Sequence, residues 1–334
     1  MKTQSNRSFL DRQLLWKRAS VAGLTFLLLC ANTSAEETTE PEICQVPFWL
    51  ISTRDCDQES PADAPDQLQY TRVRSPENHE ESTLESFLGA LSPQTRVCIF
   101  VHGNFVSQDF AEEEAGLVFR SLNKFGPKDP DIEYVVLSWP SERILPITRW
   151  DLSLKTERAD VTAHYLAQLV DRIPVTNAVT FIGYSLGARS VSGTLELLAG
   201  GVVGTHETSL TQSMSPIKRQ MHAVLIAASI DHDWLNPDER FGNALSQLEK
   251  ILILRNSDDL ALAFYPLRKL FSPGALGRVG LKEKDWDKLS GMEQKIEITD
   301  VEEIIGCSHD SDNYFNSTAI SEMIVPYVFC IPST

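Results

Sequence analysis

The sequence has few basic residues for its length. Its 334 residues include 30 lysines and arginines against 46 aspartates and glutamates, which gives a formal charge of −16. Residues 1–35 carry five basic side chains and one acidic side chain, so without them the charge is −20. A surface this acidic repels nucleic acid and anionic membranes, and the composition argues against both as partners. We expect the excess charge to serve solubility.

Metal-binding and nucleotide-binding motifs are also lacking. No CxxC or histidine-rich spacing accompanies the cysteines. Asp231-His232-Asp233 has ligand-type side chains, but three adjacent residues of an extended segment cannot easily converge on one ion. The glycines at 200–204 and 274–280 lack the strand-to-helix setting of a phosphate-binding loop. We therefore expect no cofactor and no metal.

Cysteines are few, and one of the six, Cys30, lies in an apolar run near the N-terminus. Cys98 lies in another apolar run and is expected to be a buried thiol. The pairings of sequence neighbours are the preferred disulfides, although the sequence does not fix connectivity. These pairings are Cys44 with Cys56 and Cys307 with Cys330.

The N-terminal apolar run, Ala19–Ala31, is shorter than the ~20 residues that a membrane-spanning helix needs. Basic residues precede it, and small polar residues ending at Ala35 follow it, as in a secretory signal peptide. The pattern predicts a signal peptide over residues 1–35, an acidic tail over 36–44 and export to the periplasm or beyond the cell. Retention as an N-terminal membrane anchor is the alternative. Lipidation of Cys30 is disfavoured because Leu29 is not a small residue.

Short apolar, β-branched runs alternate with helical patterns along residues 45–334, which predicts a single α/β domain with a mostly parallel, doubly wound sheet of about eight strands. The first two strands have no helix between them and are expected to form an antiparallel edge. The expected strands are Phe48–Ser52, Gln69–Val73, Val97–His102, Tyr134–Trp139, Val179–Gly183, Ala223–Ile230, Ile251–Arg255 and Ile296–Thr299. The expected helices are Phe110–Phe125, Leu152–Val170, Leu186–Leu198 and Leu260–Leu270.

The segment Gly183-Tyr184-Ser185-Leu186-Gly187 has the G-x-S-x-G pattern between a predicted strand and a predicted helix. Glycines two positions to either side of the serine suit a turn too tight for side chains. Such a turn projects the serine at a helix N-terminus, where developing negative charge is favoured. Ser185 is therefore a candidate nucleophile.

Three further segments follow predicted strands: Ser52-Thr53-Arg54, Val101-His102-Gly103-Asn104 and Trp139-Pro140-Ser141. Together with the serine motif, they make residues 45–330 resemble the α/β-hydrolase superfamily, and most of all its poorly characterised bacterial esterase branch. The resemblance implies an α/β-hydrolase fold and hydrolase activity. It also places half of an oxyanion hole at His102-Gly103-Asn104. Leu186 would supply one backbone N–H, and Asn104 or Phe105 would supply the other. The non-catalytic alternative is that this segment is a turn at the end of a strand, with His102 in a structural hydrogen bond.

The histidine that serves as base should come late in the chain, since the order of the triad in this fold is Ser, acid, His. His309 alone among seven histidines follows the last predicted strand by one loop. Two candidate acids, Asp258 and Asp259, follow the strand Ile251–Arg255. The resemblance favours Asp259, through the match of Asp259-Leu260-Ala261-Leu262 to an Asp-x-Ala-Leu pattern, and Asp258 is then expected to cap the helix. Asp231 is a third possibility.

These residues predict acyl transfer to water, with an ester-type substrate that is a small molecule or lipid-like. Carboxylesterase, lipase and thioesterase chemistry would all use the same groups. The alternatives are a non-catalytic binding protein on this fold, or an acyltransferase with the same triad. Residues 200–220 form a long connection that is either a cap or a surface loop. The sequence identifies neither the substrate nor the oligomeric state.

Overall fold

The computed structural model describes residues 46–59, 61, 67–143, 148–206, 210, 218–268, 272–289 and 291–330. These residues all belong to one compact unit, Cys44–Thr334. The predicted signal peptide, the acidic tail and Cys44 lie outside the described residues, as does most of the connection at 207–217. Within the described part of the chain, no helix is both long and apolar enough to cross a membrane.

The described residues form a nine-stranded, mostly parallel sheet. Its strands are β1 (Phe48–Ser52), β2 (Gln69–Ser75), β3 (Asn78–Ser82), β4 (Arg96–Val101), β5 (Ile132–Ser138), β6 (Val179–Tyr184), β7 (Met221–Ile226), β8 (Lys250–Arg255) and β9 (Ile296–Asp300). They lie in the order β3-β2-β1-β5-β4-β6-β7-β8-β9. The β1–β2 and β2–β3 pairs are antiparallel and all other pairs are parallel, so the predicted antiparallel edge is confirmed.

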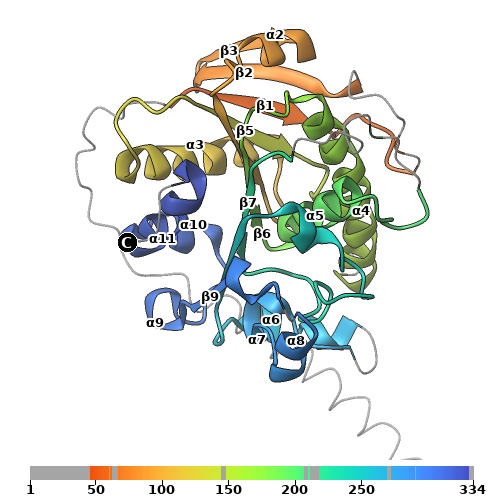
Figure 1. Ribbon diagram of the computed structural model, residues 1–334. Coiled ribbons are helices and arrows are strands. Elements are labelled where there is room, and N and C mark those ends of the chain that lie inside the picture. Colours follow the sequence, from red (N-terminus) through yellow and green to blue (C-terminus); the bar gives the residue numbers. More distant parts are fainter. Residues whose placement is uncertain are drawn as a thin grey trace, which may run out of the picture. The chain divides into compact units, whose positions relative to one another are not determined.

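Helices cover both faces of this sheet (Figure 1). The longer ones are α3 (Gln108–Phe125), α4 (Thr148–Arg172), α5 (Leu186–Leu198) and α11 (Thr318–Phe329). The shorter ones are α2 (Leu84–Gly89), α6 (Leu260–Ala263), α7 (Leu276–Val279), α8 (Glu283–Lys288), α9 (Glu302–Ile305) and α10 (Ser311–Phe315). The described residues also include the 3₁₀ turns η3 (Ala244–Gln247), η4 (Tyr265–Arg268) and η5 (Glu293–Lys295).

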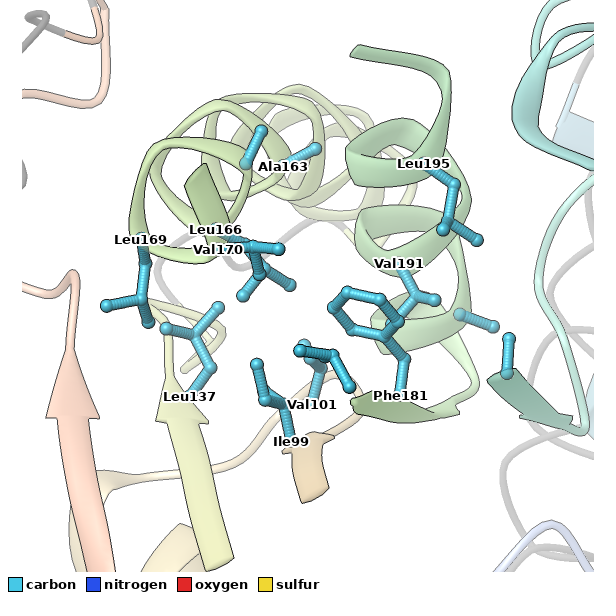
Figure 2. Packing of buried hydrophobic residues seen from close by; sticks show 14 of the residues in the cluster. Ile99, Val101, Leu137, Ala163, Leu166, Leu169, Val170, Phe181, Val191 and Leu195 are labelled. Carbon is cyan, nitrogen blue, oxygen red and sulfur yellow. The ribbon is translucent and has the colours of Figure 1, made fainter. Parts of the chain in front are cut away.

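Alternate residues of the central strands face two separate apolar cores, as the period of a β-strand requires. In β4, Ile99 and Val101 face the core that α4 and α5 cover, and Figure 2 shows Leu166, Val191 and Leu195 packed against that face. Cys98 and Phe100 face the opposite core, which α3, α10 and α11 cover. Cys98 is fully buried, as expected for a core thiol. Burial on both faces explains why the central strands have nearly continuous apolar sequences.

Two expectations about the elements are corrected, and one longer helix was not expected. The strand predicted over Ala223–Ile230 ends at Ile226, because Ala227 adopts a φ of 47° and turns the chain. The helix predicted over Leu260–Leu270 breaks after Ala263, and a 3₁₀ turn containing Pro266 follows. Residues Thr318–Phe329 form a helix that the sequence did not predict, since it is rich in β-branched residues and contains Pro326.

The predicted Cys307–Cys330 disulfide is wrong, because both thiols are free. Cys307 lies near the carboxyl end of β8, where its carbonyl accepts a hydrogen bond from Leu260 N–H. The Cys330 sulfur lies 3.6 Å from Nδ1 of His222, near the amino end of the neighbouring parallel strand β7. The two cysteines are therefore at opposite ends of the sheet. Cys56 is buried and forms no disulfide with another described residue.

Candidate functional site

Ser185 lies between the end of β6 and the start of α5, with a φ of 52° that non-glycine residues rarely adopt. The two flanking glycines permit this turn. A Cβ on Gly183 would lie 2.7 Å from Cα of Ala188, and one on Gly187 would lie 2.1 Å from the carbonyl oxygen of Val101 in β4. The turn thus projects Ser185 beyond the carboxyl end of the sheet, where ligands bind in open parallel sheets.

A chain of hydrogen bonds joins Ser185, His309 and Asp259. The Ser185 hydroxyl lies 3.0 Å from Nε2 of His309, and Nδ1 of the same ring lies 2.6 Å from Oδ2 of Asp259. Asp259 is fully buried, whereas the His309 side chain is 22% exposed. With Nδ1–H donated to the carboxylate, the neutral ring offers its Nε2 lone pair to the serine proton. The arrangement can take a proton from the hydroxyl and stabilise the resulting imidazolium.

The other candidate acids do not reach His309. Asp231 accepts a hydrogen bond from the Tyr265 hydroxyl at 2.8 Å. The expectation that Asp258 caps the following helix is wrong, because Asp259 is itself the cap of α6. Its Oδ1 accepts from Leu262 N–H at 2.9 Å, so the two oxygens of one carboxylate perform both roles. The sequence could not reveal that one carboxylate has both roles, because it does not show which partner each oxygen faces.

Two side chains hold the loop of His309, and the sequence did not indicate either of them. The Tyr184 hydroxyl donates to the His309 carbonyl at 2.5 Å, and the two rings pack 5.6 Å apart. The fully buried Asn256 donates from Nδ2 to the carbonyls of Gly306 at 2.8 Å and Ser308 at 3.2 Å. Since Asp259 N–H donates to the Asn256 carbonyl, the turn of the acid and the loop of the base are tied together.

The two predicted oxyanion donors lie beside the serine. Leu186 is the first residue of α5, so its N–H has no acceptor within the helix. Phe105 N–H donates to the Ser141 carbonyl at 2.9 Å, whereas Asn104 N–H has no hydrogen-bond partner among the described residues. A Cβ on Gly103 would lie 3.3 Å from Cβ of Ser185, which places this turn against the serine. Of the two alternatives, Asn104 rather than Phe105 has an N–H that no other described residue engages.

His102 holds this turn in place rather than taking part in proton transfer. Its Nε2 accepts from Trp139 N–H at 3.1 Å, which leaves Nδ1 as the donor to the Gly103 carbonyl at 2.9 Å. Trp139 returns a second hydrogen bond from its indole N–H to the His102 carbonyl at 2.9 Å. Complete burial lowers the pKa of His102 to about 3, so the ring is neutral.

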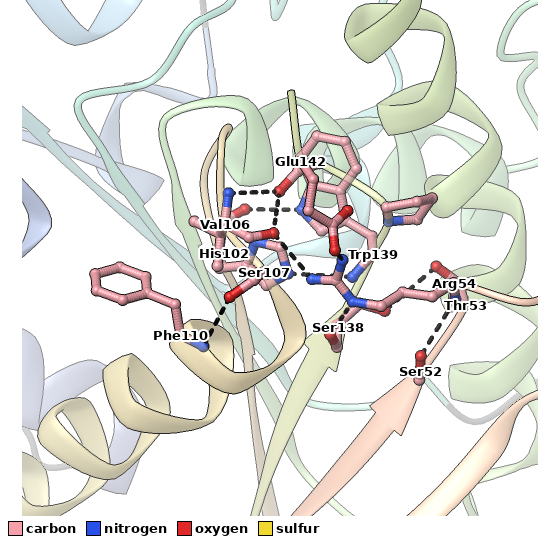
Figure 3. A network of polar contacts seen from close by, with 12 residues as sticks. Ser52, Thr53, Arg54, His102, Val106, Ser107, Phe110, Ser138, Trp139 and Glu142 are labelled. Atoms are coloured by element: carbon pink, nitrogen blue, oxygen red, sulfur yellow. Dashed lines mark hydrogen bonds and ion pairs between the residues drawn. The ribbon is translucent and has the colours of Figure 1, made fainter. Parts of the chain in front are cut away.

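Arg54 joins the loops that follow three strands (Figure 3). From the end of β1, its guanidinium donates to the Ser138 hydroxyl at 2.7 Å and to the Val106 carbonyl at 3.1 Å, and it forms an ion pair with Glu142. Burial lowers the pKa of Arg54, and the carboxylate of Glu142 partly offsets this effect. The network fixes the turn that carries Asn104 against its neighbours.

Ser229 is a further residue of the site that was not predicted from the sequence. Its hydroxyl lies 3.1 Å from the Ser185 hydroxyl, and its N–H donates to the Ser185 carbonyl at 3.1 Å. No pattern in the sequence indicated Ser229, because it lies in a run predicted to continue strand β7. Only the turn at Ala227 brings it to the serine.

The side chains of the segment 231–233 have partners elsewhere in the fold. His232 donates from Nδ1 to Oδ2 of Asp285 at 2.6 Å, and Asp231 accepts from the Tyr265 hydroxyl at 2.8 Å, so these two adjacent side chains face different partners. Throughout the described residues, no three His, Cys, Asp or Glu side chains are arranged to hold a metal ion.

The comparisons with known proteins give no family assignment. No model of a known protein family matches the chain, and no curated protein matches its sequence significantly.

Proposed function

We propose that this chain is a serine hydrolase of the α/β-hydrolase type that cleaves ester-type bonds by an acyl-enzyme mechanism. The observation that carries the proposal is the hydrogen-bond chain from Ser185 through His309 to the buried Asp259. The three residues follow different strands of a mostly parallel sheet, and the carboxyl ends of these strands bring them together. This arrangement supports the α/β-hydrolase fold as part of the proposal.

In the first half of the reaction, Ser185 Oγ attacks the carbonyl carbon of the ester while His309 Nε2 takes the hydroxyl proton. Asp259 holds the ring in the tautomer that accepts at Nε2 and stabilises the imidazolium. The N–H groups of Leu186 and Asn104 are the donors to the negative oxygen of the tetrahedral intermediate. His309 then protonates the leaving alcohol, and the acyl group remains on Ser185.

In the second half, water attacks the acyl enzyme with His309 as base, and the acid product leaves. These groups act on any ester that reaches Ser185, so the proposed substrate class is a small or lipid-like ester. Export through a signal peptide over residues 1–35 belongs to the same proposal and rests on the sequence pattern alone.

The test is labelling of the purified mature protein with a fluorophosphonate probe, which reacts with activated serines. We expect the wild type to be labelled and the Ser185→Ala variant to be unlabelled. We expect the His309→Ala variant to be labelled at least about 10³-fold more slowly, because the hydroxyl then has no base.

Ser192→Ala is the matched control, since the Ser192 hydroxyl donates only to the Ala188 carbonyl within α5. It removes a buried hydroxyl from the same helix without touching Ser185, and its labelling should equal that of the wild type. A folded wild type that remains unlabelled would overturn the hydrolase proposal and favour a binding protein on this fold.

A further inference from the structure

The backbone around Ser185 is enclosed by the turn that follows β7. Ser185 N–H donates to the Ile226 carbonyl at 2.9 Å, and the Ser185 carbonyl accepts from Ser229 N–H at 3.1 Å. Between these contacts, Ala227 has a φ of 47°, an unusual conformation for alanine. The buried Ser229 side chain is thereby fixed 3.1 Å from the Ser185 hydroxyl.

The direction of the bond between the two hydroxyls follows from the protons available. The His309 ring donates Nδ1–H to Asp259, so its Nε2 accepts the single proton of the Ser185 hydroxyl. Ser185 has then no proton left to donate to Ser229. In the resting site, Ser229 is therefore the donor and Ser185 Oγ the acceptor.

We propose that Ser229 is a further catalytic residue, whose hydroxyl donates a hydrogen bond to Ser185 Oγ and accelerates the release of the acyl group from that oxygen. This inference rests on the proposed function, since it assigns a role within the same acyl-enzyme cycle. It differs from the oxyanion donors, which bind the carbonyl oxygen of the substrate.

The effect falls on deacylation because of a change in the basicity of Oγ. In the free enzyme Oγ is an alcohol oxygen, a good acceptor, and Ser229 already donates to it before acylation begins. In the acyl enzyme Oγ is an ester oxygen, whose electron density is shared with the carbonyl, so it accepts weakly. As water adds and the C–Oγ bond breaks, negative charge develops on Oγ, and the bond from Ser229 strengthens. An interaction that strengthens towards the transition state raises the rate of that step.

The step itself balances without a proton from Ser229. Water oxygen bonds to the acyl carbon while its proton passes to His309 Nε2. The tetrahedral intermediate then collapses: the C–Oγ bond breaks, its electron pair stays on Oγ, and the imidazolium returns the proton to Oγ. The acid product leaves, and Ser229 keeps its own hydroxyl proton throughout.

The experiment is stopped-flow hydrolysis of p-nitrophenyl acetate, which separates the first release of p-nitrophenol from steady-state turnover. For Ser229→Ala we expect acylation within about threefold of wild type and deacylation slower by about five- to tenfold, the usual effect of one lost hydrogen bond. The variant should therefore show a larger burst relative to its steady state. Ser192→Ala should keep both rate constants.

Equal slowing of both steps, or no slowing of either, would overturn the role of Ser229. If Ser229→Ala does not fold, the ratio of the deacylation to the acylation rate constant is measured in Ser229→Cys instead. A thiol is a weaker hydrogen-bond donor than a hydroxyl, so this variant should slow deacylation selectively. A wild type that neither releases p-nitrophenol nor reacts with fluorophosphonate contradicts the proposed function itself. A reactive wild type with an unchanged Ser229 variant contradicts only this inference.

Discussion

Tyr184 and Asn256 hold the loop of His309 from two sides through its backbone carbonyls. Neither side chain touches Ser185 Oγ in the hydrogen-bond chain, so both act by positioning the imidazole. Tyr184 also packs its ring on His309. Because proton transfer depends steeply on geometry, a small displacement of this loop should affect turnover more than substrate binding.

Replacing Tyr184 by phenylalanine removes the hydrogen bond and keeps the ring. We expect kcat for an activated ester to fall about five- to tenfold with little change in KM, since one hydrogen bond contributes about 1 kcal/mol. Tyr134→Phe is the control, because the buried Tyr134 hydroxyl has no hydrogen-bond partner among the described residues. A Tyr184→Phe enzyme as active as Tyr134→Phe would contradict the positioning role.

Glu114 is a buried carboxyl of α3 close to the segment that follows His309. Neither of its carboxyl oxygens has a hydrogen-bond partner of normal distance and angle among the described residues, although the Ser311 hydroxyl lies nearby. Burial raises its pKa from 4.5 to about 7; the nearby Ser311 hydroxyl opposes this shift, and Asp312 and Asp310 add to it. The folded protein therefore keeps this proton to a higher pH than the unfolded chain does. The stability linked to Glu114 is intact below pH 4.5 and is lost as the pH rises through 7.

Glu114→Gln should remove this pH dependence, because the amide is neutral at every pH. The free energy of unfolding of the variant minus that of the wild type should be about 2 kcal/mol larger at about pH 8.5 than at about pH 5.5. Urea unfolding at both pH values measures the difference. Glu113→Gln, at the exposed neighbouring position, should show no such change. A constant difference between Glu114→Gln and wild type would argue against ionisation of Glu114 in this range.

The junction of β6, α5 and β4 depends on a contact between backbones. Gly187 of α5 lies so close to the end of β4 that an added Cβ would overlap the carbonyls of Val101 and His102. The helix that begins at the serine and the strand that leads to Asn104 are therefore in direct contact. This contact sets the distance between the two parts of the site.

Gly187→Ala should force β4 and α5 apart and destabilise the protein by about 3 kcal/mol or more, since backbone atoms cannot move as side chains do. Gly89→Ala is the matched substitution, because a Cβ there meets nothing within 4 Å. It should leave stability unchanged or raise it by about 0.4–1 kcal/mol. Thermal unfolding compares the two variants, and similar melting temperatures would contradict the argument.

The domain is held by two apolar cores on either side of the sheet rather than by bonds between its described cysteines. Cys307 is exposed, Cys330 is half-buried and Cys98 is fully buried. Burial also raises the pKa of Cys98, which suppresses the reactive thiolate.

Iodoacetamide applied to the native protein without a reductant should therefore modify Cys307 readily and Cys330 more slowly. Cys98 should react only after unfolding. Mass spectrometry of the alkylated peptides measures each site. Protection of both Cys307 and Cys330 until a reductant is added would show that they are in disulfides, contrary to the structure.

Local patterns were sufficient to predict the class of fold and most central elements. The apolar runs predicted the central strands to within a few residues, because strands buried on both faces must be apolar throughout. The spacing Gly183-Tyr184-Ser185-Leu186-Gly187 predicted the turn at the serine, because its backbone requirement acts over five residues. His309 was predicted from its order after the last strand. Order after a strand left both Asp258 and Asp259 as candidate acids, and only the resemblance to an Asp-x-Ala-Leu pattern favoured Asp259. Their roles in catalysis remain predictions for the labelling experiment.

The sequence by itself determined that the chain alternates strands with helices and places a serine at a tight turn between them, since both properties depend on neighbours along the chain. Only the tertiary structure decided which carboxylate reaches His309, that Ser229 meets Ser185, and that Cys307 and Cys330 lie at opposite ends of the sheet. The physical reason is that these contacts join residues about 40 to 120 positions apart. They depend on strand order and on backbone turns such as the one at Ala227, which leave no periodic trace in the sequence.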